Sequence, residues 1–333
     1  MNAAQRALAS GAIAGGAARP PVAALLVTFR PDLDRLEAAL TAVMPQVDRL
    51  IVVDNSETSE ERDAIVARLP EGCEYIALGD NLGIAAAYNR GCALVDRGAA
   101  GTPDPGTSVL LLDQDSVASS GMVTALAQAL AQPGVAACGP VYLDAVTGRG
   151  PVVLRAGLFG WRRSAVGRAQ GAPVNTESLI SSGSLISAAA RRELGGFDER
   201  LFIDHVDTDW CLRARRHGYR LLLVPDAGMR HRLGDEPQRL PWRRDRAVPR
   251  HAARRLYFIV RNGLWLMRGA AATWAWRCSE LRRLAAFAVL AALDAERAPR
   301  LRSWLRGVRD GLGGHPAIAP APASDASLVR GTR

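Results

Sequence analysis

The sequence predicts an α/β protein with a mainly parallel β-sheet and helices on both of its faces. Short apolar runs recur along the first third of the chain, and each ends in polar residues. The stretches between them favour helices, and this alternation predicts right-handed parallel crossovers. The runs are Val22 to Thr28, Leu50 to Val53, Tyr75 to Leu78 and Val109 to Leu112. Ligands of such sheets gather at the carboxyl ends of the strands, so we expect the site there.

The helices and later strands are predicted from spacing and turn residues. Apolar residues at helical spacing predict helices over 33–43 and 84–95, and another after Ser119. Residues 135–187 are richer in Gly, Val and Ser, which indicates short strands and loops rather than further strand–helix units. A helix from about Val206 to His217, ended by Gly218, is expected to precede a strand from Tyr219 to Val224.

Length and composition indicate one large folded domain with an accessory segment. The chain has 333 residues and 48% apolar residues, and domains usually hold about 100 to 200 residues. We expect a flexible tail over 1–19 and a domain over 20–240, with halves at 20–115 and 116–240. A basic amphipathic helical extension is expected over 241–311, followed by a flexible tail over 312–333.

Charge and cysteine usage indicate which partners and which cellular compartment to expect. The net charge of +9 suggests phosphorylated substrates or anionic lipid as partners, but all 42 basic residues are arginines, so coding bias explains part of the excess. We expect no nucleic-acid partner. Five cysteines without CxxC spacing favour reduced thiols and a cytoplasmic protein. No apolar stretch predicts a secretory signal or a spanning helix, so any membrane contact is expected to be peripheral.

The strongest single motif is Asp113-Gln114-Asp115, directly after a buried strand. Two carboxylates delivered to one loop can hold Mg²⁺ or Mn²⁺, whose remaining positions take diphosphate oxygens. The ion would then offset charge on a leaving nucleotide diphosphate. A solvated turn or a helix cap beginning at Ser116 would carry the same residues. The position after a buried strand counts towards a metal site, and the other motifs count further.

Three further loops follow strands and could hold a nucleotide: Thr28-Phe29, Asp54-Asn55 and Asn81-Leu82-Gly83. Carboxylate and amide groups suit a base edge, and backbone N–H groups suit phosphate. Each motif is also ordinary turn chemistry. Their shared position at strand ends is what favours binding.

An acidic segment follows Gly195 to Glu199 and contains Asp204, Asp207 and Asp209. A carboxylate at the start of a helix beside a sugar cleft can accept the proton of an attacking hydroxyl. Acidic residues also stabilise a first helical turn without any catalytic role. Asp204 and Asp207 are three residues apart and are expected to share a face, whereas Asp209 points elsewhere. We therefore predict Asp207 as the general base.

The order of these motifs resembles that of the family 2 glycosyltransferases, specifically the bacterial rhamnosyltransferases. The resemblance covers Val22 to Asp235 and is most specific over Ser182 to Ser187 and Gly195 to Ala214. It implies a GT-A fold, with a Rossmann-like sheet and a nucleotide-binding half that ends at Asn89. It also implies Asp207 as base and a divalent metal, Mg²⁺ or Mn²⁺, held through Asp113, Asp115 and His231.

The same resemblance implies dTDP-L-rhamnose as donor. Val206 precedes Asp207 where the common family pattern has Glu, as in the rhamnosyl branch, so the roles of Asp204 and Asp209 stay open, and Trp210 is a further possible acceptor contact. We expect inverting transfer of rhamnose to a glycan or lipid-linked saccharide in cell-surface polysaccharide synthesis, such as that of O-antigen and lipopolysaccharide. Another donor, galactofuranosyl or hexosyl, is the nearest alternative, and a catalytically silent scaffold docked on a membrane is a more distant one.

The C-terminal segment interleaves arginines with Trp and Leu, as in Arg254 to Phe258 and Trp265 to Arg268. Such a pattern fits a helix lying on an anionic membrane surface. It fits equally a helix packed on the catalytic domain or on another subunit. The sequence leaves both open, along with the oligomeric state.

Overall fold

A computed structural model of the chain describes residues 19–98, 104, 106–144, 152–166, 171–231, 236–240, 243–313 and 328–330. Among these, the side chains of residues 143, 144, 165, 231, 236–240, 243–250 and 328–330 fall outside the description. The tail expected over 1–19 is thus described only at Arg19. The tail expected over 312–333 is described only at 312–313 and 328–330.

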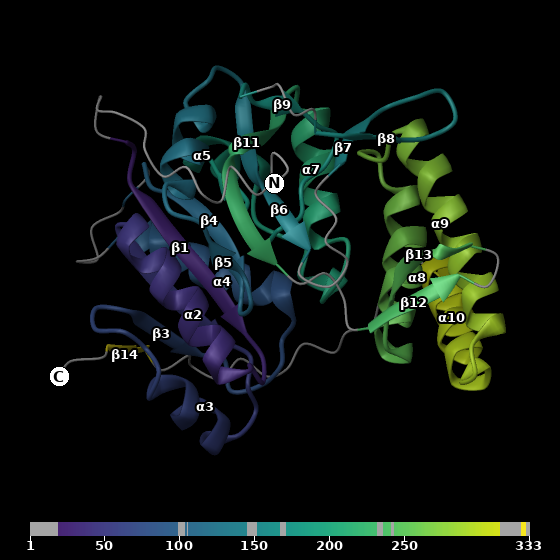
Figure 1. Cartoon of the computed structure of the whole chain (residues 1–333), viewed down its shortest axis with the longest axis horizontal. Coiled ribbons are helices and arrows are strands. Elements are labelled where there is room, and N and C mark those ends of the chain that lie inside the picture. The colour runs from purple at the N-terminus through teal and green to yellow at the C-terminus, as the bar shows by residue number, and fades with distance from the viewer. Residues whose placement is uncertain are drawn as a thin grey trace.

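The first half of the sheet is the predicted parallel unit (Figure 1). It contains β1 (Val22–Thr28), β2 (Arg49–Asp54), β3 (Glu74–Ala77) and β4 (Ser108–Asp113). β1 lies between β2 and β4, and β2 also pairs with β3. The register sets Thr28 opposite Asp54 and Val27 opposite Asp113, so the strands end together. The four predicted strands are confirmed to within one residue at each end.

The second half of the sheet is mixed. Its strands are β5 (Val117–Ala118), β6 (Val135–Asp144), β9 (Val174–Asn175), β10 (Leu185–Ile186) and β11 (Arg220–His231). β10 runs antiparallel between β4 and β6, whereas β6 and β11 are parallel. The short strands expected over 135–187 are found, except that β6 is ten residues long. Backbone pairing also adds β14 (Leu328–Arg330) beside β3.

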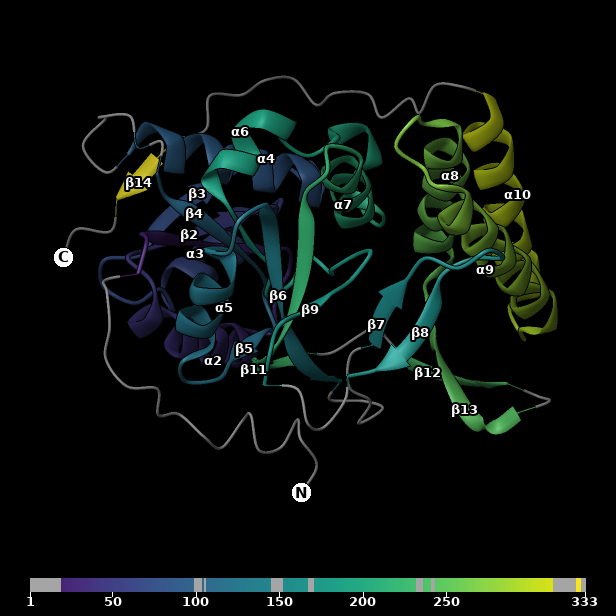
Figure 2. The same cartoon turned by 90° about the horizontal axis from the view of Figure 1, so that it is seen from above.

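Helices cover both faces of the sheet, as Figure 2 shows. One face carries α2 (Leu33–Val43), α3 (Ser59–Val66) and α5 (Met122–Leu130), and the other carries α4 (Ile84–Arg97), α6 (Ala188–Leu194) and α7 (Val206–Arg216). Alternate residues of β1 serve the two faces: Leu25 packs with the α4 and α7 side, and Leu26 with the α2 and α5 side. This period of two explains why a strand buried on both sides reads as a continuous apolar run.

The C-terminal part is a separate group of three helices at one end of the molecule (Figures 1 and 2). They are α8 (Ala253–Arg268), α9 (Trp274–Leu293) and α10 (Arg297–Gly313), which share a small apolar cluster of their own. Gly307 and Gly311 let α10 approach α8 closely, because a Cβ on either would lie 2.8 Å from a backbone oxygen of α8. We call α8 to α10 the helical unit.

Two hairpins lie near the helical unit. One joins β7 (Val152–Arg155) to β8 (Arg162–Ala165), and the other joins β12 (Glu236–Leu240) to β13 (Arg243–Arg250). In the described part of the chain, no helix has the length and apolar character needed to span a bilayer.

Candidate active site

A pocket of about 750 Å³ lies at the carboxyl ends of the strands. Its walls come from the loops after β1 to β4, the loop before α7 and the first turn of α8. Asp113, Asp115 and Asp207, which lie up to 94 residues apart in the sequence, all line it. The structure therefore brings the predicted metal motif and the predicted base into one cleft.

The predicted nucleotide loops form one wall of this pocket. Thr28, Phe29, Asn81 and Gly83 line it, together with Asn55. The Phe29 N–H donates to Gln114 Oε1 at 2.8 Å, which ties the first loop to the Asp-Gln-Asp motif. Gln114, the middle residue of that motif, thus holds the first loop at the pocket wall.

Gly83 is required by a close backbone approach. Its φ is +86°, and a Cβ there would lie 2.6 Å from the Phe202 carbonyl oxygen. That same oxygen accepts from the Ile84 N–H at 2.8 Å. The glycine of the Asn-Leu-Gly motif therefore joins the nucleotide side of the pocket to the loop that precedes Asp207.

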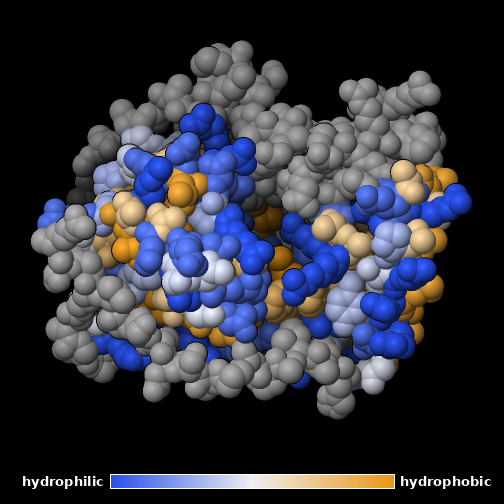
Figure 3. Space-filling model, turned by 90° about the horizontal axis from the view of Figure 1, so that it is seen from below, coloured by the Kyte–Doolittle hydropathy of each residue, from blue (hydrophilic) through white to orange (hydrophobic). Residues whose placement is uncertain are grey.

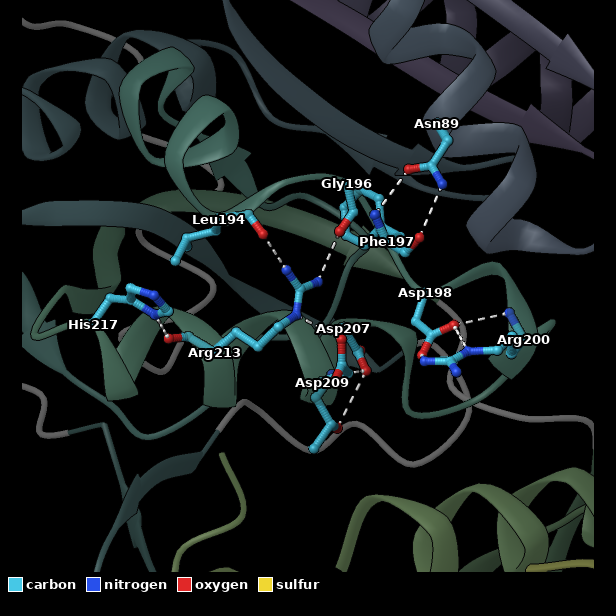
Figure 4. A network of polar contacts seen from close by, with 11 residues as sticks. Asn89, Leu194, Gly196, Phe197, Asp198, Arg200, Asp207, Asp209, Arg213 and His217 are labelled. Carbon is cyan, nitrogen blue, oxygen red and sulfur yellow. Dashed lines mark hydrogen bonds and ion pairs between the residues drawn. The ribbon is translucent and has the colours of Figure 1, made fainter. Parts of the chain in front are cut away.

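Asp54 and Asn89 lie outside the pocket wall. Asp54 is fully buried below the loops and accepts from Thr28 Oγ1 and the Tyr75 hydroxyl, each at 2.8 Å. Asn89 donates to the Phe197 carbonyl at 2.9 Å and accepts from the Phe197 N–H at 2.8 Å (Figure 4). In the structure, Asp54 hydrogen-bonds to residues of the two neighbouring strands, β1 and β3. Asn89 connects α4 to the Gly-Gly-Phe loop.

The side chains of Asp113 and Asp115 supply two carboxylates to the pocket. The Tyr88 hydroxyl, which is fully buried, donates to Asp113 Oδ1 at 3.3 Å. Oxygen ligands of this kind suit Mg²⁺ or Mn²⁺. No group of three or more ligating side chains occurs among the described residues. The backbone of His231 ends β11, and its side chain lies outside the described part.

Asp207 stands in the first turn of α7 with its carboxylate on the pocket wall. The Ser181 N–H donates to Oδ2 at 3.2 Å and the Thr208 N–H to Oδ1 at 2.6 Å, so the carboxylate orientation is fixed. Burial by the surrounding protein raises the pKa of Asp207 above its ordinary value of 3.8, and it outweighs these two hydrogen bonds, which lower it. A carboxylate with a raised pKa is a stronger base, which suits proton abstraction.

Asp204 and Asp209 lie on different sides of Asp207. Asp204 lines the pocket, but it lies in the loop before α7, so the predicted shared helix face does not apply. Asp209 points away to Arg213, with Oδ2 2.8 Å from Nε. Figure 4 shows that the Arg213 side chain reaches on to the carbonyl oxygens of Leu194 and Gly196. Trp210 is buried in the core.

The loop before α7 holds an unusual backbone conformation. Phe202, Asp204 and His205 have φ values of 63°, 63° and 62°. Non-glycine residues in this region cost about 1 to 3 kcal/mol each, so contacts from elsewhere must hold the loop. We call residues 201–205 the base loop.

Two buried residues of α8, Arg261 and Asn262, donate hydrogen bonds to backbone carbonyls of the base loop. Asn262 is fully buried, and its Nδ2 donates to the carbonyl oxygens of residues 201, 203 and 204 at 2.9, 2.8 and 3.0 Å. Arg261 Nη2 donates to the Arg200 carbonyl at 2.7 Å, and Arg261 Nε donates to Asn262 Oδ1 at 2.9 Å. The helical unit therefore packs on the base loop, where the backbone is strained.

Two side-chain contacts reinforce this packing. Arg255 of α8 lines the pocket and contacts the Asp204 carboxylate at 3.1 Å. Buried Glu280 of α9 lies 3.3 Å from His205 Nε2 and 2.7 Å from Arg283. Burial acts to raise the pKa of Glu280, but His205 and Arg283 outweigh it and lower the pKa to about 2. Glu280 is thus ionised beside the base loop.

A family model described as glycosyl transferase family group 2 matches residues 108–294, more than half of the chain. The chain belongs to this family. It is therefore a glycosyltransferase, and the predicted resemblance to the rhamnosyltransferase branch is confirmed by two relatives. The dTDP-rhamnosyl transferase RfbF of Shigella flexneri is 30% identical, over 74% of this chain and 79% of the relative. The N-acetylglucosaminyl-diphospho-decaprenol L-rhamnosyltransferase of Mycobacterium tuberculosis is 26% identical, over 74% of this chain and 85% of the relative.

A solved structure supports the fold of the glycosyltransferase. The crystal structure of GalNAc-T7 with UDP, GalNAc and Mn²⁺ superposes with a TM-score of 0.54 at 11% identity and covers 90% of this chain. The chain spans 58% of that protein's length. At this identity the likeness concerns the fold alone, and it confirms the GT-A prediction.

Sequence reasoning missed the residues that the helical unit contributes to this glycosyltransferase. Arg255, Asn262 and Glu280 follow the base loop by 50 or more residues, and none belongs to a predicted site motif, although Arg255 lies in the Arg254 to Phe258 stretch. A signal was present for one of them: Asn262, with Arg261 before it, interrupts the apolar stretch between Phe258 and Leu266. A buried amide in such a place needs polar partners.

Proposed function

We propose that this glycosyltransferase transfers L-rhamnose from dTDP-L-rhamnose to a saccharide acceptor, with inversion at the anomeric carbon. The observation that carries the proposal is the common pocket of Asp113, Asp115 and Asp207. The names of both relatives support the rhamnosyl group, and one of them includes dTDP. We assign the acceptor to a glycan or lipid-linked saccharide of cell-surface polysaccharide synthesis, such as O-antigen.

In the proposed reaction the acceptor hydroxyl oxygen bonds to the anomeric carbon as the bond from that carbon to the dTDP oxygen breaks. The hydroxyl proton passes to the Asp207 carboxylate, which the Ser181 and Thr208 N–H groups hold in place. Attack on the face opposite the leaving group gives inversion. Thr28, Phe29, Asn81 and Gly83 would bind the nucleotide, while Asp54 and Asn89 support that wall from behind.

Asp113 and Asp115, with His231 as a proposed third ligand, would hold Mg²⁺ or Mn²⁺. Their carboxylates fit a hard divalent ion, which supplies charge neutralisation for the departing diphosphate when bound. Asp204, held by Arg255 at the pocket wall, is the better placed of the two remaining carboxylates to touch the acceptor. We also propose a cytoplasmic location, which the five free cysteines support.

The test is transfer assayed with purified protein, dTDP-L-rhamnose and a membrane extract, with the modified lipid followed by mass. Asp207→Asn should bind dTDP like the wild type and lose transfer by at least about a hundredfold. Asp209→Asn is the matched control on the same helix, because Asp209 faces Arg213 outside the pocket, and it should keep its turnover. Undiminished turnover of Asp207→Asn would refute the base assignment. Turnover of a UDP-galactofuranose or UDP-hexose donor in place of dTDP-rhamnose would refute the donor.

A further inference from the structure

Exposed apolar side chains gather at one end of the molecule. Ten large hydrophobic residues are exposed in the described part, and all except Val66 lie on the β7–β8 hairpin, α9 or α10. The most exposed are Leu158, Phe159 and Trp274, at 78%, 80% and 69%. Figure 3 shows the resulting hydrophobic surface along the edge formed by the C-terminal helices. Such a concentration of large exposed apolar side chains marks an interaction site.

The hairpin tip and α9 form one continuous surface. The Trp161 N–H donates to Ser279 Oγ at 2.6 Å, and Arg282 donates to the Phe159 carbonyl oxygen. Both partners lie on α9, beside its exposed stripe. At about 100° per residue, the exposed apolar residues of α9 spread over an arc of about 120°, and Arg282 lies inside that arc. These residues, Trp274, Leu281, Val289 and Leu293, form the α9 stripe. The tip residues therefore stand next to the helix residues, and the contacts with α9 hold them there.

The charge around this surface is positive. Residues 152–166 of the hairpin contain Arg155, Arg162 and Arg163, which are exposed, and no acidic residue. Arg282 of α9 is also exposed beside the tip. Phe, Leu and Trp side chains rimmed by arginine suit the boundary between acyl chains and anionic headgroups. A second copy of this chain would instead bring like charges together.

We propose that the β7–β8 tip and the α9 stripe dock the enzyme on an anionic phospholipid bilayer. Leu158, Phe159 and Trp274 would enter the interface, and the neighbouring arginines would lie at the level of the phosphates. The helical unit, which carries the α9 part of this surface, also contributes Arg255 to the pocket. Docking through it would hold the pocket close to the bilayer, where lipid-linked acceptors lie.

The first experiment is cosedimentation of the full chain with vesicles of phosphatidylglycerol and phosphatidylcholine in equal parts. The double variant Leu158→Ser with Phe159→Ser should bind at least about tenfold more weakly, since each residue loses apolar burial. Val66→Ser, the exposed apolar residue on α3, is the matched control and should bind like the wild type. Arg162→Gln with Arg163→Gln should weaken binding to these vesicles and not to phosphatidylcholine alone.

The second measurement places Trp274 in the bilayer. Brominated lipids quench tryptophans that reach the acyl region, so the wild type should be quenched and Trp274→Phe should lose most of that quenching. Absence of binding by the wild type, or equal binding by the tip variant, would overturn the proposal. So would light scattering that shows a dimer which the tip variant converts to a monomer. None of these readouts depends on transfer activity, so the proposal stands or falls apart from the donor assignment.

Discussion

Replacing Asn262 by leucine should disable catalysis without unfolding the enzyme. The change keeps the number and branching of the side-chain heavy atoms and removes the amide that donates to three base-loop carbonyls. Two of these carbonyls, at residues 203 and 204, have no other protein donor among the contacts described for the loop. A buried acceptor left without a partner costs about 1 to 3 kcal/mol, so for the two carbonyls we expect a loss of about 2 to 6 kcal/mol in the free energy of unfolding.

Part of that loss should be relieved by relaxation of the base loop. Asp204 and His205, with φ near +63°, store about 2 kcal/mol or more and would return to ordinary conformations once the donors are gone, whereas the Ile84 N–H still holds the Phe202 carbonyl. Val206 and Asp207 follow the base loop directly. Their backbone, and with it the Asp207 carboxylate, would therefore move. A displacement of about 1 Å in a catalytic group costs about a hundredfold in rate. We therefore expect kcat to fall about tenfold to a hundredfold.

The assay combines urea unfolding, dTDP binding by calorimetry and initial rates of dTDP release. The nucleotide wall does not contact Asn262, so the Kd for dTDP should change by less than about threefold. Tyr257→Phe is the matched control on the same helix, because it removes a 3.0 Å hydrogen bond to Asp310 of α10 and keeps the ring. It should cost about 1 kcal/mol of stability and leave kcat unchanged. If Asn262→Leu were equally destabilised and kept its kcat, the base loop would not depend on this helix.

Three further predictions concern the carboxylates. Asp115→Ala should lose metal-dependent binding of dTDP, and calorimetry with Mn²⁺ that gives unchanged affinity would count against the metal assignment. Because the pKa of Asp207 is raised and its base form is needed, kcat/KM should fall as the pH drops, at a pH above the ordinary 3.8; a flat profile down to pH 4 would contradict this. Glu280 has its pKa lowered from 4.5 to about 2 in the folded state, so its contribution is present above pH 4.5 and is lost as the pH falls towards 2. Urea unfolding should show that loss, at most about 3 kcal/mol, and Glu280→Gln should lack most of it.

The parallel half of the sheet was predictable because a strand buried on both faces leaves a plain signal. Val22–Thr28 and Ser108–Asp113 are continuous apolar runs followed at once by polar residues. The same logic placed Asp113, Asp115 and the Asn81–Gly83 loop at one edge. It could not tell which strand-end side chain faces the pocket, and Asp54 turns inward to Thr28 and Tyr75 instead. Side-chain direction at a strand end depends on its neighbours across the sheet.

The base loop was beyond prediction for a different reason. Phenylalanine at position 202 disfavours a positive φ, so no local rule places it there. The conformation exists because contacts from α8 and from Gly83 hold it, and these contacts lie far away in the sequence. The predicted helix over Val206 to His217 was found, ending at Arg216, because its signals are local. Contacts between residues this far apart in the sequence leave no periodic pattern in it.

The hydrogen bonds from α8 to residues 201–205 have consequences for the synthesis of the polypeptide and for its truncation. A ribosome delivers the strands and Asp207 well before residues 261, 262 and 280 emerge, so a nascent enzyme would have its sheet before its reactive geometry. A fragment ending at residue 240, the boundary that composition suggests, would keep the nucleotide wall and lack the donors of α8 that hold Asp204 and its neighbours. For this chain, the segment that contains strands β1 to β11 ends before the segment that is needed for catalysis.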